Sequence, residues 1–394
     1  MGCEVKMPKL SRRARWGVPA GVVAVTGAVM AGMLISTAQA SPVLPARSAA
    51  QLLAAVGGRT GELPPLTGTV VETAKLGLPD LPGVSDPTSV ASLLTGSHTI
   101  RIWYGGPHQL RIAVPGAMSE SDIILNGHTG WYWQSSTNTV TKLTFPAGQR
   151  AATTPELPVL TPQQAAQQAI AAVGPTTRVS VQTNVTVAGV PAYQLMLVPR
   201  SADSLVGQVR IAIDATHHVP LRVQVYARHA SNPAFQVGFT SISFAHPAAA
   251  NFDFTAPPGA KVRTETLSGV NDRTPDWTAG AQPSVTGHGW LAVAELSSQL
   301  LSDGLGGLAG GQSSASAAAS SAAQSAAGTP GASGVSGAGL AGVLLRTATP
   351  VRGAWGSGKL LRTPLLDVLM TSDGRVLLGA VTPALLYAAA AHAG

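Results

Sequence analysis

The sequence predicts a mainly β fold of the α+β class, built around one long antiparallel sheet. Apolar and polar residues alternate in short runs from about Ser97 to Phe254, as in strands that bury one face. The segments between these runs are too short to hold crossover helices, which favours an antiparallel meander over a parallel sheet. Few helical patterns interrupt the runs, so few helices are expected to cover the sheet.

The N-terminus of the 394-residue chain has the pattern of an export signal. A basic segment precedes an uncharged apolar stretch at residues 17–35, and Ala38-Gln39-Ala40 matches a signal-peptidase site, so we expect cleavage after Ala40. About twenty apolar residues can also span a bilayer. Residues 1–40 are therefore either a signal peptide or an uncleaved anchor that contacts the membrane through residues 17–35. In both cases the rest of the chain is extracytoplasmic, in the cell envelope or secreted.

Charge and cysteine content exclude several functions. The net charge of +7 falls to about +3 without residues 1–40, which carry five basic groups and one acid. No dense run of Lys and Arg remains, so nucleic acid is not an expected partner. The single cysteine, Cys3, leaves the exported part without disulfides or a thiol nucleophile.

The first elements precede the meander. Residues 45–56 are expected to form a short amphipathic helix, and residues 66–73 a first long strand. A loop rich in Pro and Gly follows, and then a helical turn at residues 90–94.

Tight turns divide the first half of the meander. Asn126-Gly127 separates a run that ends at Leu125 from a run that contains Trp131 and Trp133. Asn-Gly between alternating runs is the strongest short-range signal for a hairpin.

A helix separates the two halves of the meander. Thr161 is a good N-cap and Pro162 suits the first helical position, and the helical pattern stops at Gly174-Pro175. Short connections join the five strands expected after it, at residues 178–187, 192–199, 206–214, 221–228 and 235–244.

The C-terminal part is expected to be a small separate unit. Residues 41–262 form the main domain, 263–288 a polar linker, and 289–394 a small unit interrupted by a Gly/Ala/Ser-rich low-complexity insertion at 302–339. Turn residues at 371–375 predict a hairpin, and Thr382-Pro383 predicts the start of a final helix. The alternative is that this hairpin extends the main sheet.

The sequence lacks the common catalytic motifs. No G-x-S-x-G, H-E-x-x-H, P-loop or G-x-G-x-x-G motif occurs in a strand–helix context. His217 and His218 adjoin a turn and point to opposite sides, which favours a solvated loop over a metal site. The acidic residues Asp203, Asp214 and Glu265 are scattered. We therefore expect a protein that is not an enzyme and has no metal or cofactor.

The apolar sheet itself is the candidate binding surface. Uncovered apolar sheet is costly in water, so it must curl, pair or hold a ligand. One interpretation is that its apolar face is ordinary core; the other is that part of it lines a groove for a lipid. By strand parity alone, the lipid-binding candidates are Ile102, Trp131, Trp133, Ile211, Val225 and Phe239.

Four segments carry a resemblance to the LolA/RseB (MucB)-like superfamily of extracytoplasmic lipid- and lipoprotein-binding proteins, including exported members from Gram-positive bacteria. They are residues 66–73, 122–133, 214–223 and 252–262, and together they span about half of the chain. The resemblance implies a curved, unclosed antiparallel half-barrel with lid helices over a concave apolar face that holds acyl chains.

Two functions follow from the sequence and this resemblance. The first is non-catalytic binding of the acyl chains of a lipid or lipoprotein. The alternative is an RseB-like regulator that binds a membrane anti-sigma factor in envelope stress, for which the small C-terminal unit is the motivation.

Overall fold

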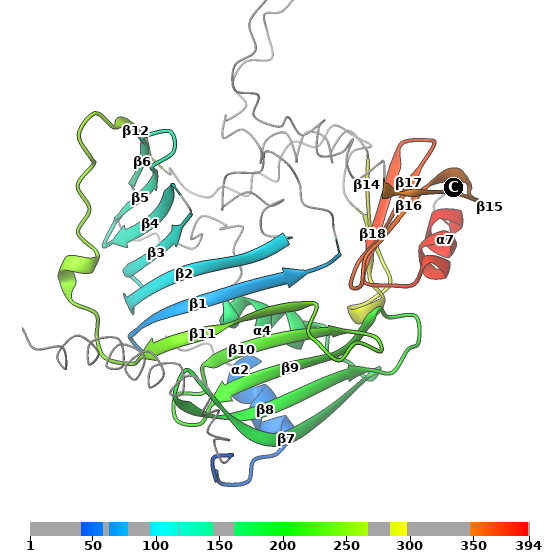
Figure 1. Ribbon diagram of the computed structural model, residues 1–394, viewed down its shortest axis with the longest axis horizontal. Helices are drawn as coiled ribbons and strands as arrows, with labels where there is room; N and C mark the ends of the chain where they lie inside the picture. Colours follow the sequence, from blue (N-terminus) through cyan, green and yellow to red (C-terminus); the bar gives the residue numbers. More distant parts are fainter. Residues whose placement is uncertain are drawn as a thin grey trace, which may run out of the picture. The chain divides into compact units, whose positions relative to one another are not determined.

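A computed structural model describes residues 41–57, 63–77, 95–116, 118–144, 161–266, 284–297 and 347–392 (Figure 1). The export signal, the turn expected at residues 90–94 and the low-complexity insertion at 302–339 lie outside these ranges. In the described part of the chain, no helix has the length and apolar character needed to cross a membrane.

The main sheet has twelve strands in the order β12-β6-β5-β4-β3-β2-β1-β11-β10-β9-β8-β7. All neighbouring pairs are antiparallel except β12 and β6, and the sheet does not close into a barrel. This confirms the predicted mainly β, unclosed half-barrel. The strands are β1 (Leu66–Lys75), β2 (Thr95–Gly106), β3 (Gln109–Pro115), β4 (Glu120–Asn126), β5 (Thr129–Gln134), β6 (Thr139–Thr144), β7 (Thr177–Val187), β8 (Val190–Pro199), β9 (Val206–Asp214), β10 (Pro220–Ala227), β11 (Phe235–Ser243) and β12 (Lys261–Thr266).

Two helices cover one face of the strands β7 to β11, as Figure 1 shows. Helix α2 spans Ala49–Gly57 and helix α4 spans Pro162–Ala171. The expected N-cap of α4 is present: the Thr161 hydroxyl accepts the amide of Gln164, whose side chain accepts the Thr161 amide in return. We call the covered face of the sheet the inner face and the opposite one the outer face.

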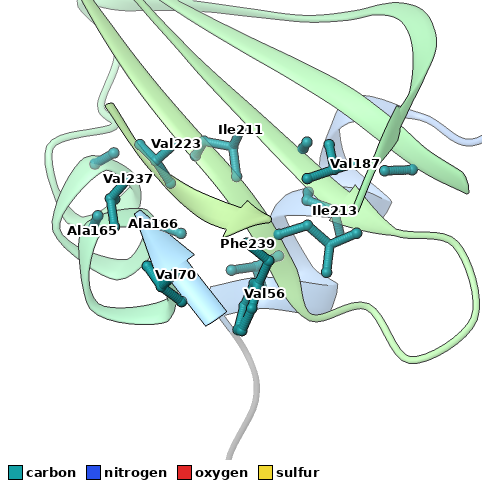
Figure 2. Packing of buried hydrophobic residues seen from close by; sticks show 14 of the residues in the cluster. Val56, Val70, Ala165, Ala166, Val187, Ile211, Ile213, Val223, Val237 and Phe239 are labelled. Atoms are coloured by element: carbon teal, nitrogen blue, oxygen red, sulfur yellow. The ribbon is translucent and has the colours of Figure 1, made fainter. Parts of the chain in front are cut away.

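The inner face is the hydrophobic core of the main sheet. Val70 of β1 lies opposite Ile100 and Phe239, and Ile211 of β9 lies opposite Leu195 and Val223. Ala165 and Ala166 of α4 and Val56 of α2 pack on this face, as the close view in Figure 2 shows. Ala169 of α4 and Leu52 of α2 belong to the same core. Small side chains on α4 let the helix approach the sheet closely, because no long side chain separates them.

The segment between β11 and β12 runs past the ends of β2 and β4 and reaches the outer face at β5. It includes the short helix η1 (Ala249–Asn251), and Phe252 is 1% exposed against Gly105. Phe254 contacts Trp131 and Trp133, and β12 then pairs with β6. We call residues 249–260 the strap. The sheet thus continues to Thr266, beyond Phe254, where the alternating runs of the sequence end.

The C-terminal residues form a separate sheet of six strands with the order β13-β14-β18-β17-β16-β15. The predicted hairpin lies in this smaller sheet and does not extend the main one. Helix α7 (Pro383–His392) packs on β17 and β18. The elements are β13 (Ser284–Thr286), η2 (Gly289–Leu291), β14 (Val293–Ser297), β15 (Thr349–Gly353), β16 (Gly356–Arg362), β17 (Asp367–Thr371) and β18 (Arg375–Gly379).

Candidate functional site

The structure divides the six predicted lipid-binding residues between the two faces of the sheet. Ile102, Ile211 and Phe239 lie on the inner face and are buried there, and Val225 lies on the same face and is half-buried. Trp131 and Trp133 lie on the outer face. The six residues therefore do not form one surface.

The hairpin between β4 and β5 explains this separation. Asn126 pairs with Thr129 across a turn of two residues, so Ile123 lies opposite Tyr132 and Ile124 lies opposite Trp131. Because directly paired residues point to the same face, Tyr132 shares the inner face with Ile123, and both tryptophans point outward. A two-residue loop at Gly127-His128 would have given this register from the sequence.

The two tryptophans contact the strap. The Phe254 ring centroid lies 5.4 Å from that of Trp131 and 6.4 Å from that of Trp133. The Lys142 ammonium lies 5.0 Å from the Trp131 ring centroid. These side chains hold the strap against the outer face.

An apolar pocket of about 720 Å³ lies where the end of α4 meets the small unit. Three stretches line it: residues 171–176 at the end of α4, the β13–η2 turn at residues 286–289, and one side of α7. We call it the junction pocket. Its α7 side consists of Leu385, Ala388, Ala389 and His392, and Leu291 and Val293 complete its apolar lining.

The junction pocket adjoins the inner-face core. Val173 lines the pocket and also packs against that core, as Ile170 of α4 does. Val225 lies on the inner face near the end of β10, where Ala227 pairs with Val206 at the start of β9. The small unit is attached at this same end of the sheet, through residues 204–205. An apolar surface therefore continues from the pocket toward the core.

Specific contacts hold the small unit at this position. The Trp290 indole Nε1 donates to the Thr177 hydroxyl at 2.8 Å. Ser204 and Val381 form a β-bridge, the Leu205 amide donates to the carbonyl of Ala380, and the Thr382 amide donates to that of Asp203. Sequence patterns missed these contacts because each joins segments that are far apart in the chain.

Two buried carboxylates, Asp122 and Asp367, have raised pKa values. Burial raises the pKa of Asp122 to about 6, although Arg111, whose Nη2 lies 2.5 Å from an Asp122 oxygen, lowers it. Burial likewise raises the pKa of Asp367 to about 6, against the opposing effect of Arg362. In the residues that the structure describes, no group of three His, Cys, Asp or Glu side chains could hold a metal.

His217 and His218 lie beside the β9–β10 turn, where His217 contacts neighbouring residues. The Nδ1 atom of His217 lies 3.0 Å from the buried Asp214 carboxylate, and its ring stacks on Phe244 with centroids 3.9 Å apart. His218 adopts a positive φ of 56°. The pair thus shapes the turn, with its side chains in different surroundings.

Comparison with known proteins gives structural likeness only. No protein-family model and no curated protein matches the chain. The MucA/MucB complex of Pseudomonas aeruginosa is 14% identical over 87% of this chain and 96% of that chain, with a TM-score of 0.39. A conserved protein from Thermus thermophilus is 12% identical over 55% of this chain and 99% of that chain, with a TM-score of 0.30.

A LolA superfamily protein from Nitrosomonas europaea is 11% identical over 53% of this chain and 99% of that chain, with a TM-score of 0.21. Because these TM-scores are below 0.5, we take no binding residue and no function from these structures. MucB and LolA-type proteins are thus among the solved structures to which the chain is similar at low identity.

Proposed function

We propose that this is an extracytoplasmic, non-catalytic protein that binds the acyl chain of a lipid or lipoprotein. The junction pocket carries the proposal. Its volume of about 720 Å³ lies in the range of small-molecule sites, roughly 300–1,000 Å³, which are mostly apolar with a few polar groups. Its lining is mainly Ala, Leu, Val and Gly, and His288 and His392 are its imidazoles.

The energetics suit an acyl ligand. Each methylene removed from water contributes about 0.8 kcal/mol, so ten methylenes contribute on the order of 8 kcal/mol before ordering costs. Such a ligand needs no dense set of polar contacts. This agrees with a pocket whose chemistry is apolar and whose polar groups are few.

The candidate residues on the inner face are placed to contact the end of an acyl chain that enters through the junction pocket. Val225 is half-buried and lies at the end of the sheet that carries the small unit, whereas Ile102 and Phe239 lie deeper in the core. We propose that the ligand enters at the junction pocket and that Val225, followed by Ile211, Phe239 and Ile102, forms the apolar surface beyond it. Trp131 and Trp133 point away from this path.

A pocket-filling variant tests the proposal. Ala388 lines the pocket on α7, and Ala391 lies on the same helix, exposed and outside the pocket lining. We expect Ala388→Trp to weaken uptake of a fluorescent fatty acid by at least about tenfold, which corresponds to roughly 1.4 kcal/mol. Ala391→Trp should bind as the wild type does. Equal uptake by both variants would contradict binding in the junction pocket.

The small unit supports a second candidate function, regulation through a protein partner. MucB, one of the similar structures, was solved in complex with MucA. Here the small unit has its own sheet, and the junction pocket lies where it is attached, so a ligand in this pocket would alter how it is held. We propose that a membrane anti-sigma factor is the partner in this case. Unchanged pull-down of envelope proteins and unchanged stress-gene expression after deletion of residues 340–394 would exclude it.

A further inference from the structure

The outer face of the main sheet carries an excess of positive charge. Residues of β2, β3, β6, β9 and β10 that point outward include Arg101, Arg111, Lys142, Arg210 and Arg222. The carboxylates with the same orientation on β4 are Asp122 and Glu120, at one side of the sheet. Asp122 is buried and paired with Arg111. Asp214 of β9 also points outward, buried and in contact with His217, and Asp253 lies beside Asn126 at the end of β4. The basic residues outnumber these carboxylates on the strands β2, β3, β6, β9 and β10, and Arg101 lies apart from all of them.

A hollow of about 230 Å³ lies on this face, over strands β2, β1 and β11. Two cross-strand rows surround it: Ser243–Thr67–Trp103 and Ser241–Thr69–Arg101. Each row places hydroxyl groups on neighbouring strands beside a larger side chain. We call these six residues the hydroxyl hollow; Gly68 and Ile242 complete its lining.

A β-bulge creates this arrangement. The register of β1 against β11 shifts at Thr69/Val70, because Ser241 lies opposite Thr69 whereas Phe239 lies opposite Val70. The extra residue, Thr240, donates its hydroxyl to the Thr69 carbonyl at 3.2 Å. The bulge changes the parity of the strand, so Phe239 points inward while Ser241 and Ser243 point outward. Bulges commonly redirect side chains in this way at functional sites.

The chemistry of the hydroxyl hollow suits an anion with several oxygens. Four hydroxyls can donate hydrogen bonds, and the exposed Arg101 guanidinium offers the planar donor pair that matches a phosphate. In the described part of the chain no carboxylate forms a salt bridge with Arg101. Trp103 is half-buried beside it, with the Arg111 guanidinium 5.4 Å from its ring centroid. Tryptophan next to basic residues is the composition that favours a membrane interface.

We propose that the outer face docks on an anionic phospholipid bilayer, with the hydroxyl hollow binding the phosphate of one lipid head group. The basic residues of β9 and β10 extend the contact across the same face. This docking is independent of acyl binding in the junction pocket, since the two surfaces share no residue. A bilayer fits better than an acidic protein, because the charge is spread over a broad sheet face.

Vesicle flotation of the protein as its host exports it tests the proposal. Vesicles contain either phosphatidylcholine alone or about 30% phosphatidylglycerol, and inorganic phosphate is titrated separately as a free anion. The variants are Arg101→Gln in the hydroxyl hollow and Arg352→Gln, a matched loss of one exposed charge on β15 of the small unit. Any membrane binding through residues 17–35 is common to all variants, and the neutral vesicles measure it.

We expect binding to the anionic vesicles that is about fivefold weaker for Arg101→Gln, since one basic residue near an anionic surface contributes on the order of 1 kcal/mol. Arg352→Gln should bind as the wild type does, and higher salt should weaken binding. Equal partitioning of both variants, or equal binding to neutral and anionic vesicles, would overturn the proposal. So would binding of inorganic phosphate without binding to vesicles. Circular dichroism and the melting temperature confirm that each variant is folded.

Discussion

Asp122 lies directly opposite Trp133 in the β4–β5 pair, and its carboxylate binds Arg111 of β3 while its side chain is 1% exposed. The pair lies on the outer face, near the contact between the strap and Trp133. A carboxylate in this position is held in place by one ion pair but loses most of its hydration.

The raised pKa of Asp122 makes stability depend on pH. The folded-state pKa of about 6 is above the ordinary value of 3.8, so the folded protein binds a proton more tightly than the unfolded chain does between these values. The free energy of unfolding should therefore fall as pH rises from about 4 to about 7, by on the order of 3 kcal/mol for this group. Urea titrations at several pH values would measure it.

Asp122→Asn should remove that part of the pH dependence, because the amide does not titrate. Asp367→Asn provides the comparison, since Asp367 has a pKa of about 6 in the other sheet. Each substitution should reduce the dependence of the free energy of unfolding on pH by the amount that the replaced carboxylate contributes. A curve for Asp122→Asn with the wild-type slope would show that Asp122 ionises normally.

The strap should contribute substantially to stability through Phe252. Its ring is 1% exposed and lies against Gly105, so Phe252→Ala should lower the free energy of unfolding by about 3–5 kcal/mol. Phe254→Ala should cost less, because that residue is only half-buried, but should change the fluorescence of Trp131 and Trp133. A Phe252→Ala variant as stable as the wild type would mean that the strap is not packed on the sheet.

Gly68 should not tolerate a side chain. An added Cβ would lie 2.6 Å from the Phe239 ring and 2.9 Å from the Ser241 carbonyl oxygen. Gly68→Ala should therefore destabilise the protein by about 1–3 kcal/mol through overpacking. Gly174→Ala is the control, since no atom lies within 4 Å of its Cβ position. Similar melting temperatures for both variants would contradict the close packing at Gly68.

The Trp290–Thr177 hydrogen bond should hold the small unit against the main sheet. Thr177→Val removes the acceptor and should cost about 1 kcal/mol. Amide hydrogen exchange of β13 and β14 should increase in this variant, while exchange in β8 and β9 should stay as in the wild type. Thr349→Val offers a comparison within the small unit, where the hydroxyl donates to the Leu360 carbonyl. Unchanged exchange in Thr177→Val would show that the other contacts suffice.

Local patterns predicted most of the fold. The capped start of α4 at Thr161-Pro162 and the strand Val206–Asp214 agree with the structure, because each depends on residues adjacent in the chain. The hairpin at residues 371–375 is also confirmed, with Gly374 at φ 89°. These features need no long-range information.

Features that depend on distant segments were not predicted. The sequence of β12 is typical of a polar linker, and only its pairing with β6 makes it a strand. The orientation of Ser241 depends on a β-bulge that has no signal in the sequence. The orientation of Trp131, by contrast, depends on the local hairpin register, which a two-residue loop at Gly127-His128 would have given. The junction pocket combines residues 171–176, 286–289 and α7, so no local pattern could indicate it.

Acyl binding is tested most directly by native mass spectrometry of the protein purified from its host under mild conditions. We expect an added mass equal to a lipid or acylated ligand, released by organic extraction, and we expect Ala388→Trp to reduce the bound fraction while Ala391→Trp does not. Only the mass of the ligand-free polypeptide, together with no uptake of a fluorescent fatty acid, would contradict the proposed function.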